Sequence, residues 1–510
     1  MAIPTAQGGE PAQTPRGGFF GHPRGLSTLF FTEFWERFSF YGLRPLLTLF
    51  MTAATVKGGM GFATSRATAI FGLYAAAVYL GSLPGGWIAD RLLGQRRAVF
   101  YGGCLIALGQ FSLAIPGRIT FFLGLALMVS GTGLLKPNVS TMVGELYPET
   151  GPDAGARRDA GFSIFYMGIN LGAFVAPLFS GWLGERVDWH VGFASAGLGM
   201  IFGLIQYRLG WRHLGGAGLR PNATLDPGAR RRALAVLWSA LAAAILLAAA
   251  IAGDVIRVTA ERLADVAGIA ILAIALVYFG YQILWGGLTG EEKKRMMAIS
   301  VLFLFSALFW SGSEQAATSL NLFARDLTNR TVSGWEMPVS FLQSVNPLFI
   351  ILFAPVFAVV WQRMGRRNPS SPTKFGLGLV FLGLGFLVIA AATLIAIGHA
   401  VMGPGVTPHK VSPWWLVLTY LFATFGELCV SPVGLSTVTK LAPHRKVSQM
   451  MGIWFMSISL GEVVAGQVAG TYERLPLFGT FGAVGATTIV AGLILLLLAR
   501  PLRRLIGSAE

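Results

Sequence analysis

Apolar segments of about 20 residues recur along almost the whole chain, and this repetition restricts the possible folds more than any other feature. A helix of that length spans the hydrocarbon core of a bilayer. The segments begin near residue 27 and continue to residue 500 of a 510-residue chain. Hydrophobic residues make up 54% of the chain, whereas only 12% are charged. The sequence therefore predicts an all-α polytopic membrane protein with about fourteen transmembrane helices.

The predicted helices form two groups of six that flank an additional pair. The first six are expected near 27–51, 66–89, 96–115, 119–143, 159–184 and 190–211, and the last six near 295–320, 337–362, 374–397, 412–439, 448–470 and 476–500. The additional pair, near 232–253 and 264–287, carries almost no polar groups, so we expect it to face lipid. The predicted domains are a tail at 1–26, an N-terminal bundle at 27–211, a basic linker and helix hairpin at 212–294, a C-terminal bundle at 295–500 and a tail at 501–510. Paired bundles of this kind flank a central cavity.

The net charge of +16 is not spread evenly. Basic residues gather in alternate connections, among them Arg91, Arg96 and Arg97, Arg230 to Arg232, Lys293 to Arg295, and Arg363, Arg366 and Arg367. This alternation is the positive-inside bias of membrane proteins, so both termini are predicted to be cytoplasmic, and binding of nucleic acid is not expected. Cys104 and Cys429 lie inside apolar segments, which argues against a disulfide framework.

Several charged residues fall inside the predicted spans, where each would cost about 2.5–3.5 kcal/mol if it faced lipid. They are Glu33, Glu36, Arg37, Arg44, Lys136, Glu314, Glu427 and Glu462. In the first span, helical geometry places Glu33, Arg37 and Tyr41 on one stripe. An amphipathic helix on the membrane surface is the alternative, but the apolar run continues beyond the charges through Met51. The charged residues are therefore predicted to line an interior.

The sign of these charges differs between the two groups of helices. Arg37, Arg44 and Lys136 lie in the first six, whereas the last six contribute only the acids Glu314, Glu427 and Glu462. A cavity between the bundles would have one positive and one negative wall. Such a cavity suits a zwitterion, and a peptide of two or three residues separates its charged ends by about 7–11 Å.

Proton coupling would have to use carboxylates, because all six histidines fall in loops or at span ends. Glu33 and Glu36 compete for Arg37 when they are charged and release it for a substrate carboxylate when they are protonated. The alternative is a structural ion-pair triad that only fixes helix packing. For Glu462 the two interpretations stay open.

Aromatic and amide side chains accompany these charges. Tyr41, Tyr79, Trp310 and Trp454 are candidates to bound pockets for side chains of a peptide. Asn170 and Asn346 are candidates to hold its amide or terminal groups, although lone amides in apolar helices also bridge helices.

Motifs in nearly every core span resemble one family. They are Glu33-x-x-Glu36-Arg37-Phe38-x-Phe40-Tyr41, the segments Gly85–Arg91, Gly133–Asn138 and Phe165–Gly172, and later Trp310 with Glu314, Gln343 with Asn346, Gly426 with Glu427, and Trp454. This set resembles the proton-dependent oligopeptide transporter family, a branch of the major facilitator superfamily. Phe40 departs from the tyrosine that relatives commonly have, and the second helix lacks the histidine of animal members.

The resemblance implies a monomeric symporter, not an enzyme, that imports di- and tripeptides with protons across the bacterial inner membrane by alternating access, without a cofactor or metal. It implies proton coupling by Glu33, Glu36, Arg37 and Lys136, and a cytoplasmic gate at Asp90 and Arg91. It further implies peptide contacts from Arg37, Tyr41, Tyr79, Lys136, Asn170, Trp310, Glu314, Asn346, Glu427 and Trp454. Another substrate of the same transporter class, such as nitrate or a peptide-like drug, is the alternative. A channel is disfavoured because the sequence contains no filter-like repeated pore segment.

Overall fold

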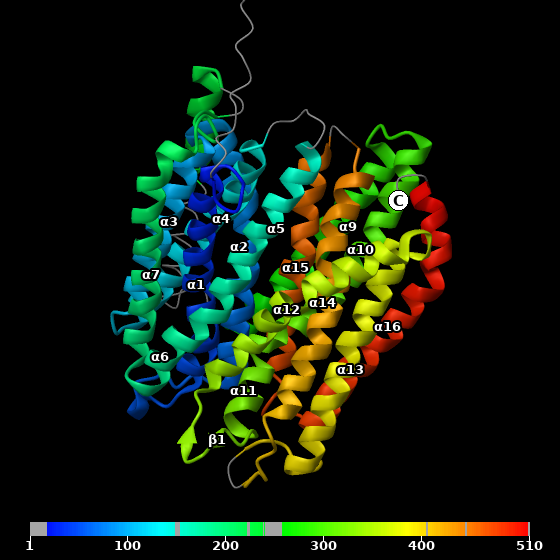
Figure 1. Ribbon diagram of the computed structural model, residues 1–510. Helices are drawn as coiled ribbons and strands as arrows, with labels where there is room; N and C mark the ends of the chain where they lie inside the picture. Colours follow the sequence, from blue (N-terminus) through cyan, green and yellow to red (C-terminus); the bar gives the residue numbers. More distant parts are fainter. Residues whose placement is uncertain are drawn as a thin grey trace, which may run out of the picture.

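A computed structural model describes residues 18–147, 154–221, 225–237, 239, 258–403, 406–443 and 446–507. Most of these residues are helical, and the helices run roughly side by side in two groups (Figure 1). All of the core spans expected from the sequence overlap a helix. The first expected helix of the additional pair lies mostly outside the described residues.

The N-terminal group consists of helices joined by short connections. It comprises α1 (Arg24–Thr52), α2 (Thr64–Ile88), α3 (Gln95–Leu113), α4 (Arg118–Glu145), α5 (Ala154–Ala176), α6 (Trp182–Arg186) and α7 (Trp189–Gly210), with a π-helical turn, η3 (Pro177–Gly181), between α5 and α6. Small residues let these helices approach closely. A Cβ atom on Gly102 of α3 would lie 2.7 Å from the carbonyl oxygen of Gly131 on α4.

The C-terminal group differs from expectation in its first helix, which is longer and interrupted. It comprises α10 (Gly290–Ser313), the 3-10 turn η5 (Glu314–Ala317), α11 (Ser319–Asp326), the 3-10 helix η6 (Val339–Ser344), α12 (Val345–Met364), α13 (Ser371–Ile397), α14 (Trp414–Leu441), α15 (Val447–Ala469) and α16 (Leu477–Ile506). A short β-hairpin of β1 (Thr331–Val332) and β2 (Trp335–Glu336) precedes η6. The interruption places Glu314 at the point where α10 ends.

The second helix of the additional pair, α9 (Ala260–Trp285), packs against both groups. The Ser65 hydroxyl of α2 donates to Glu261 at 3.1 Å, and Gln467 of α15 donates to Asp265 at 2.6 Å. The opposite side of α9 exposes apolar side chains, among them Ile269 and Val277. This position agrees with the predicted contact with lipid.

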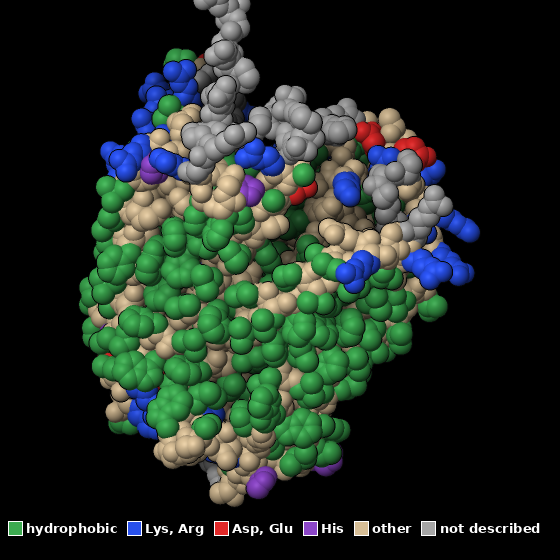
Figure 2. Space-filling view, in the orientation of Figure 1, with side chains coloured by type: hydrophobic (Ala, Val, Ile, Leu, Met, Phe, Trp, Pro, Cys, Tyr) green, Lys and Arg blue, Asp and Glu red, His purple; other side chains and the backbone are tan. Residues whose placement is uncertain are grey.

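Eleven helices within the described residues are long and apolar enough to cross a membrane. α1 is not among them because its middle carries Glu33, Glu36, Arg37 and Arg44, yet it is almost completely buried. Hydrophobic side chains cover the middle of the visible face, and Lys and Arg gather mainly at one end (Figure 2). We call this the basic end; α1 begins and α16 ends there (Figure 1).

Contacts between the two groups gather at the end that carries β1 and β2, which we call the closed end. Thr48 of α1 donates to the Ala317 carbonyl at 2.9 Å, and Arg325 of α11 donates to Thr52 at 2.8 Å. Thr64 of α2 donates to Glu473 at 2.6 Å. Near the basic end, by contrast, the surface is hollowed between the groups (Figure 2). The structure is therefore open toward the basic end.

Candidate functional site

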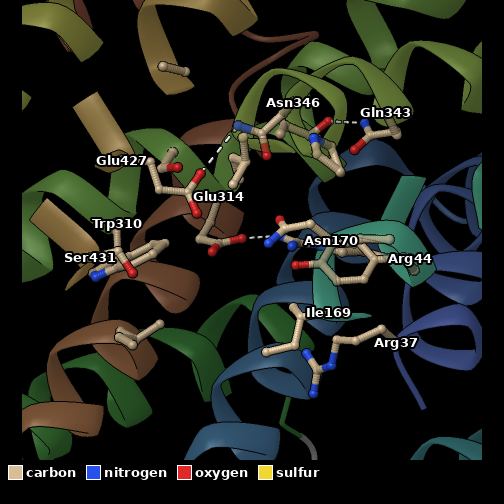
Figure 3. A pocket seen from close by; sticks show the side chains of 18 of the residues that line it. Arg37, Arg44, Ile169, Asn170, Trp310, Glu314, Gln343, Asn346, Glu427 and Ser431 are labelled. Carbon is tan, nitrogen blue, oxygen red and sulfur yellow. Dashed lines mark hydrogen bonds and ion pairs between the residues drawn. The ribbon is translucent and has the colours of Figure 1, made fainter. Parts of the chain in front are cut away.

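A cavity of about 260 Å³ lies between the two bundles. This volume is slightly below the usual range for small-molecule pockets, about 300–1,000 Å³. Both bundles line the cavity, as the charges in the sequence predicted. The predicted site residues on its wall are Glu33, Arg37, Tyr41, Tyr79, Lys136, Asn170, Trp310, Glu314, Asn346 and Glu427 (Figure 3).

The carboxylates of α1 surround Arg37 as the helical spacing predicted. Arg37 Nε lies 3.1 Å from Glu33 Oε1 and 2.5 Å from Glu36 Oε2. All three side chains are buried, and the Arg37 guanidinium also lies 5.4 Å from the centre of the Phe40 ring. Glu33 and Arg37 reach the cavity, whereas Glu36 lies behind them. Two acids therefore share one guanidinium at the cavity wall.

Lys136 reaches the same part of the cavity from α4. Its ammonium nitrogen lies 4.1 Å from the centre of the Tyr79 ring, a cation–π distance. Among the described residues, no carboxylate pairs with Lys136 within 4.0 Å. This cation is thus available to an anionic group that enters the cavity.

A second charge cluster joins the bundles. Its central residue, Arg44, was among the charges predicted to line an interior but not among the predicted proton-coupling or peptide-contact residues. Arg44 of α1 forms an ion pair with Glu314 Oε2 across the interface, and its Nη2 lies 3.9 Å from Glu462 Oε1 on α15. Arg44 is 9% exposed and lines the cavity. Helical spacing could have added Arg44 to the predicted site, since it lies two helical turns beyond Arg37 and therefore on the same face of α1. The positive charge of Arg44 on the N-terminal bundle is therefore neutralised by Glu314 of the C-terminal bundle.

Glu427 and Asn346 form the negative side of the cavity. Asn346 Nδ2 donates to Glu427 Oε2 at 3.2 Å (Figure 3). It also donates to Thr424 Oγ1 at 3.0 Å. Within the part of the chain that the structure describes, no Lys, Arg or His lies within 4.0 Å of the Glu427 carboxylate. Asn170, on the other bundle, donates its amide to the Tyr166 carbonyl at 2.9 Å, one turn earlier in α5. Glu427 and Lys136 are thus unpaired charges of opposite sign on opposite bundles.

Three further predicted residues lie outside this cavity. Trp454 is 4% exposed and lines a smaller adjoining hollow, which shares Trp310 and Ser431 with the main cavity. Asp90 and Arg91 lie in a π-helical turn, η2 (Ala89–Leu93), which follows α2 at the basic end. Their gating role stays a prediction.

Comparison with known proteins agrees with this geometry. The model of the POT family matches residues 96–485. The peptide transporter YePEPT of Yersinia enterocolitica is 42% identical over 512 residues, which cover 98% of each chain. A di-/tripeptide transporter of Lactococcus lactis subsp. cremoris is 38% identical over 504 residues, which cover 96% of this chain and 98% of the relative.

A crystal structure of the peptide transporter POT in complex with sulfate has a TM-score of 0.89 and 43% identity, covering 97% of this chain and 98% of the other. These matches confirm the predictions of a two-bundle transporter fold and of a transporter instead of an enzyme. Because the similarity extends over both bundles, the chain belongs to the POT family.

Proposed function

We propose that this protein is a proton-coupled symporter that imports di- and tripeptides by alternating access. The observation that carries the proposal is the pair of free charges in the cavity, Lys136 on one bundle and Glu427 on the other. A zwitterionic peptide matches both, whereas an inorganic anion would leave Glu427 without a partner. Relatives that are named peptide transporters support the same substrate class.

The two walls suggest how the ends of a peptide would bind. Lys136, Arg37 and Tyr41, which line the cavity on the N-terminal bundle, would receive the carboxylate. Glu427, Asn346 and Asn170 would receive the amino end, with Glu314 as a second acid. Tyr79, Trp310 and, from the adjoining hollow, Trp454 would bound the side chains. The small cavity favours substrates of two or three residues.

Protons would act on the carboxylates that pair with Arg37 and Arg44 of α1. Protonation of Glu33 or Glu36 would weaken the hold on Arg37 and free it for the substrate carboxylate. Protonation of Glu314 would break its ion pair with Arg44 and so loosen one connection between the bundles. Inward movement of one proton charge supplies about 2.3 kcal/mol per 100 mV of membrane potential, which is enough to bias the cycle.

The charge distribution supports an orientation. By the positive-inside bias, the basic end and both termini would lie in the cytoplasm. The protein would act as a monomer in the inner membrane of a bacterial cell. The structure would then represent the inward-open state. The contacts at the closed end must break when the cavity opens outward, and Asp90 and Arg91 would help to close the cytoplasmic side.

Reconstitution in liposomes tests the function directly. With an inwardly directed proton gradient, di-alanine and tri-alanine should accumulate, and a protonophore should abolish the accumulation. Free alanine and nitrate should not compete, and liposomes without protein are the control. Accumulation of nitrate, or peptide uptake that ignores the protonophore, would contradict the proposal.

A further inference from the structure

A second carboxylate lies behind the ion pair that joins the bundles. Glu462 of α15 is 1% exposed, and its Oε1 lies 3.9 Å from the Arg44 nitrogen that also pairs with Glu314. Among the described residues, Glu462 Oε2 has no hydrogen-bond partner. Arg44 and Glu314 line the cavity, but Glu462 does not. The guanidinium thus has one acid in front, facing the cavity, and one behind.

Tight packing fixes the backbone of α15 at this position. A Cβ atom on Gly72 of α2 would lie 2.8 Å from the Glu462 carbonyl oxygen. A Cβ atom on Gly461 would lie 2.5 Å from Trp310 Cβ on α10. Because α15 is pressed between α2 and α10, the backbone that carries Glu462 cannot move away from Arg44 without a shift of the helix.

The charged and titratable groups around Glu462 come from several helices. They are Arg44 on α1, Tyr74 and Tyr79 on α2, and Lys136 on α4, while Glu314 shares Arg44 with Glu462. Tyr41 and Glu427 act on Arg44, and Asp265 of α9 is bonded to Gln467, farther along α15. Of the cations in this set, Arg44 lies within 4.0 Å of Glu462. Arg44 is therefore its natural partner.

The need for a second acid follows from the chemistry of arginine. A guanidinium stays charged at any relevant pH, and a buried charge without a partner is strongly unfavourable. If Glu314 is protonated, or if it binds the amine of a substrate, Arg44 loses its partner in the cavity. Glu462 already lies close enough for a small side-chain rotation to replace that partner.

We propose that Glu462 is a positioning residue, a reserve counter-ion that holds Arg44 whenever Glu314 releases it. The inference rests on the proposed function, in which Glu314 releases Arg44 during transport. The arrangement repeats the one at Arg37, where Glu33 and Glu36 share a guanidinium. At each arginine one acid balances the charge, and the other is free to carry a proton.

The test compares Glu462→Gln, Glu314→Gln and the double variant in liposomes. The measurement is exchange of labelled di-alanine with equal pH on both sides, from mildly acidic to mildly alkaline pH. Low pH favours the protonated form of any carboxyl group, including Glu314, so the loss of exchange in Glu462→Gln should be at least tenfold larger at acidic than at alkaline pH. The exchange rate of the double variant should lie at least about tenfold below the rate expected if the losses in the two single variants simply multiplied. This tenfold difference corresponds to a coupling free energy of about 1.4 kcal/mol.

Two further variants separate positioning from packing. Glu291→Gln makes the same change at an exposed pair with Lys294 and should behave like the native protein. Glu462→Asp retains the charge and should restore the native pH profile. Three results would overturn the inference. Glu462→Gln could lose the same fraction of exchange at every pH, or the loss in the double variant could equal the product of the two single losses. In the third, the pH profile of Glu462→Asp would resemble that of Glu462→Gln. Failure of the native protein to accumulate peptide with protons would instead overturn the proposed function.

Discussion

Glu185 helps to hold the closed end together by capping a helix that belongs to the other bundle. Its carboxylate accepts hydrogen bonds from the backbone nitrogens of Val339, at 2.7 Å, and Ser340, at 2.8 Å, in the first turn of η6. A carboxylate at a helix N-terminus satisfies backbone donors that lack partners within the helix. Because Glu185 lies on α6, outward opening must break both bonds.

The structure sets the magnitude expected for Glu185→Gln. A hydrogen bond to a charged acceptor is worth about 1.5–3 kcal/mol, and the lower value applies to this partly exposed carboxylate. The amide offers one acceptor oxygen in place of two, so one bond is lost in the closed arrangement. A loss of about 1.5 kcal/mol should raise the outward-open population about tenfold.

Distances between spin labels across the closed end measure this population. The labels would be attached at Val56 and Val332, which lie on opposite bundles and are 92% and 55% exposed. The native Cys104 and Cys429 would first be replaced, so that only the introduced cysteines react. Glu336→Gln is the matched control. It breaks exposed ion pairs, which are worth about 0–1 kcal/mol, and should change the population less than Glu185→Gln does.

An unchanged distance distribution in Glu185→Gln would refute the capping argument. An equal change in both variants would show that the general charge of this surface, and not the cap, holds the bundles together.

The remaining predictions concern the cavity. Glu427→Gln should lower peptide uptake at least about tenfold, because it removes the charge for the amino end; uptake of labelled di-alanine measures the loss, and uptake at the native level would contradict the role of Glu427. Arg37→Lys should abolish proton-driven accumulation, since an ammonium cannot replace the guanidinium shared by two carboxylates, and residual accumulation near the native level would count against that role. Glu33→Gln and Glu36→Gln should lose concentrative uptake but retain exchange of labelled peptide, and full concentrative activity in both would exclude the proton switch.

The contacts within α1 could be predicted because they depend on local geometry alone. Residues four apart lie on the same face of a helix, so Glu33 and Arg37 meet whatever surrounds them. The ion pair of Arg44 with Glu314 joins residues 270 positions apart in the sequence. No local pattern predicts such a contact, because it depends on which faces of the two bundles meet.

The break between α10 and α11 shows the same limit. The apolar run predicted an uninterrupted helix at 295–320, and no proline lies in that segment. In the structure, the carbonyls of Ala316 and Ala317 accept side-chain hydrogen bonds from Gln343 and Thr48. Partners from η6 and α1 thus compensate for helical bonds that η5 gives up, and these partners exist only in the assembled fold.

Hydropathy and helical periodicity are properties of residues that are close in the sequence. The sequence alone therefore determined the spans, the orientation bias and the charges that must avoid lipid. The tertiary structure decided which of those charges are neutralised. It pairs Arg44 with Glu314 and leaves Lys136 and Glu427 facing the cavity without ion-pair partners among the described residues. It also decided which end is closed, since that depends on contacts such as Glu185 with η6 that form only when the two bundles meet.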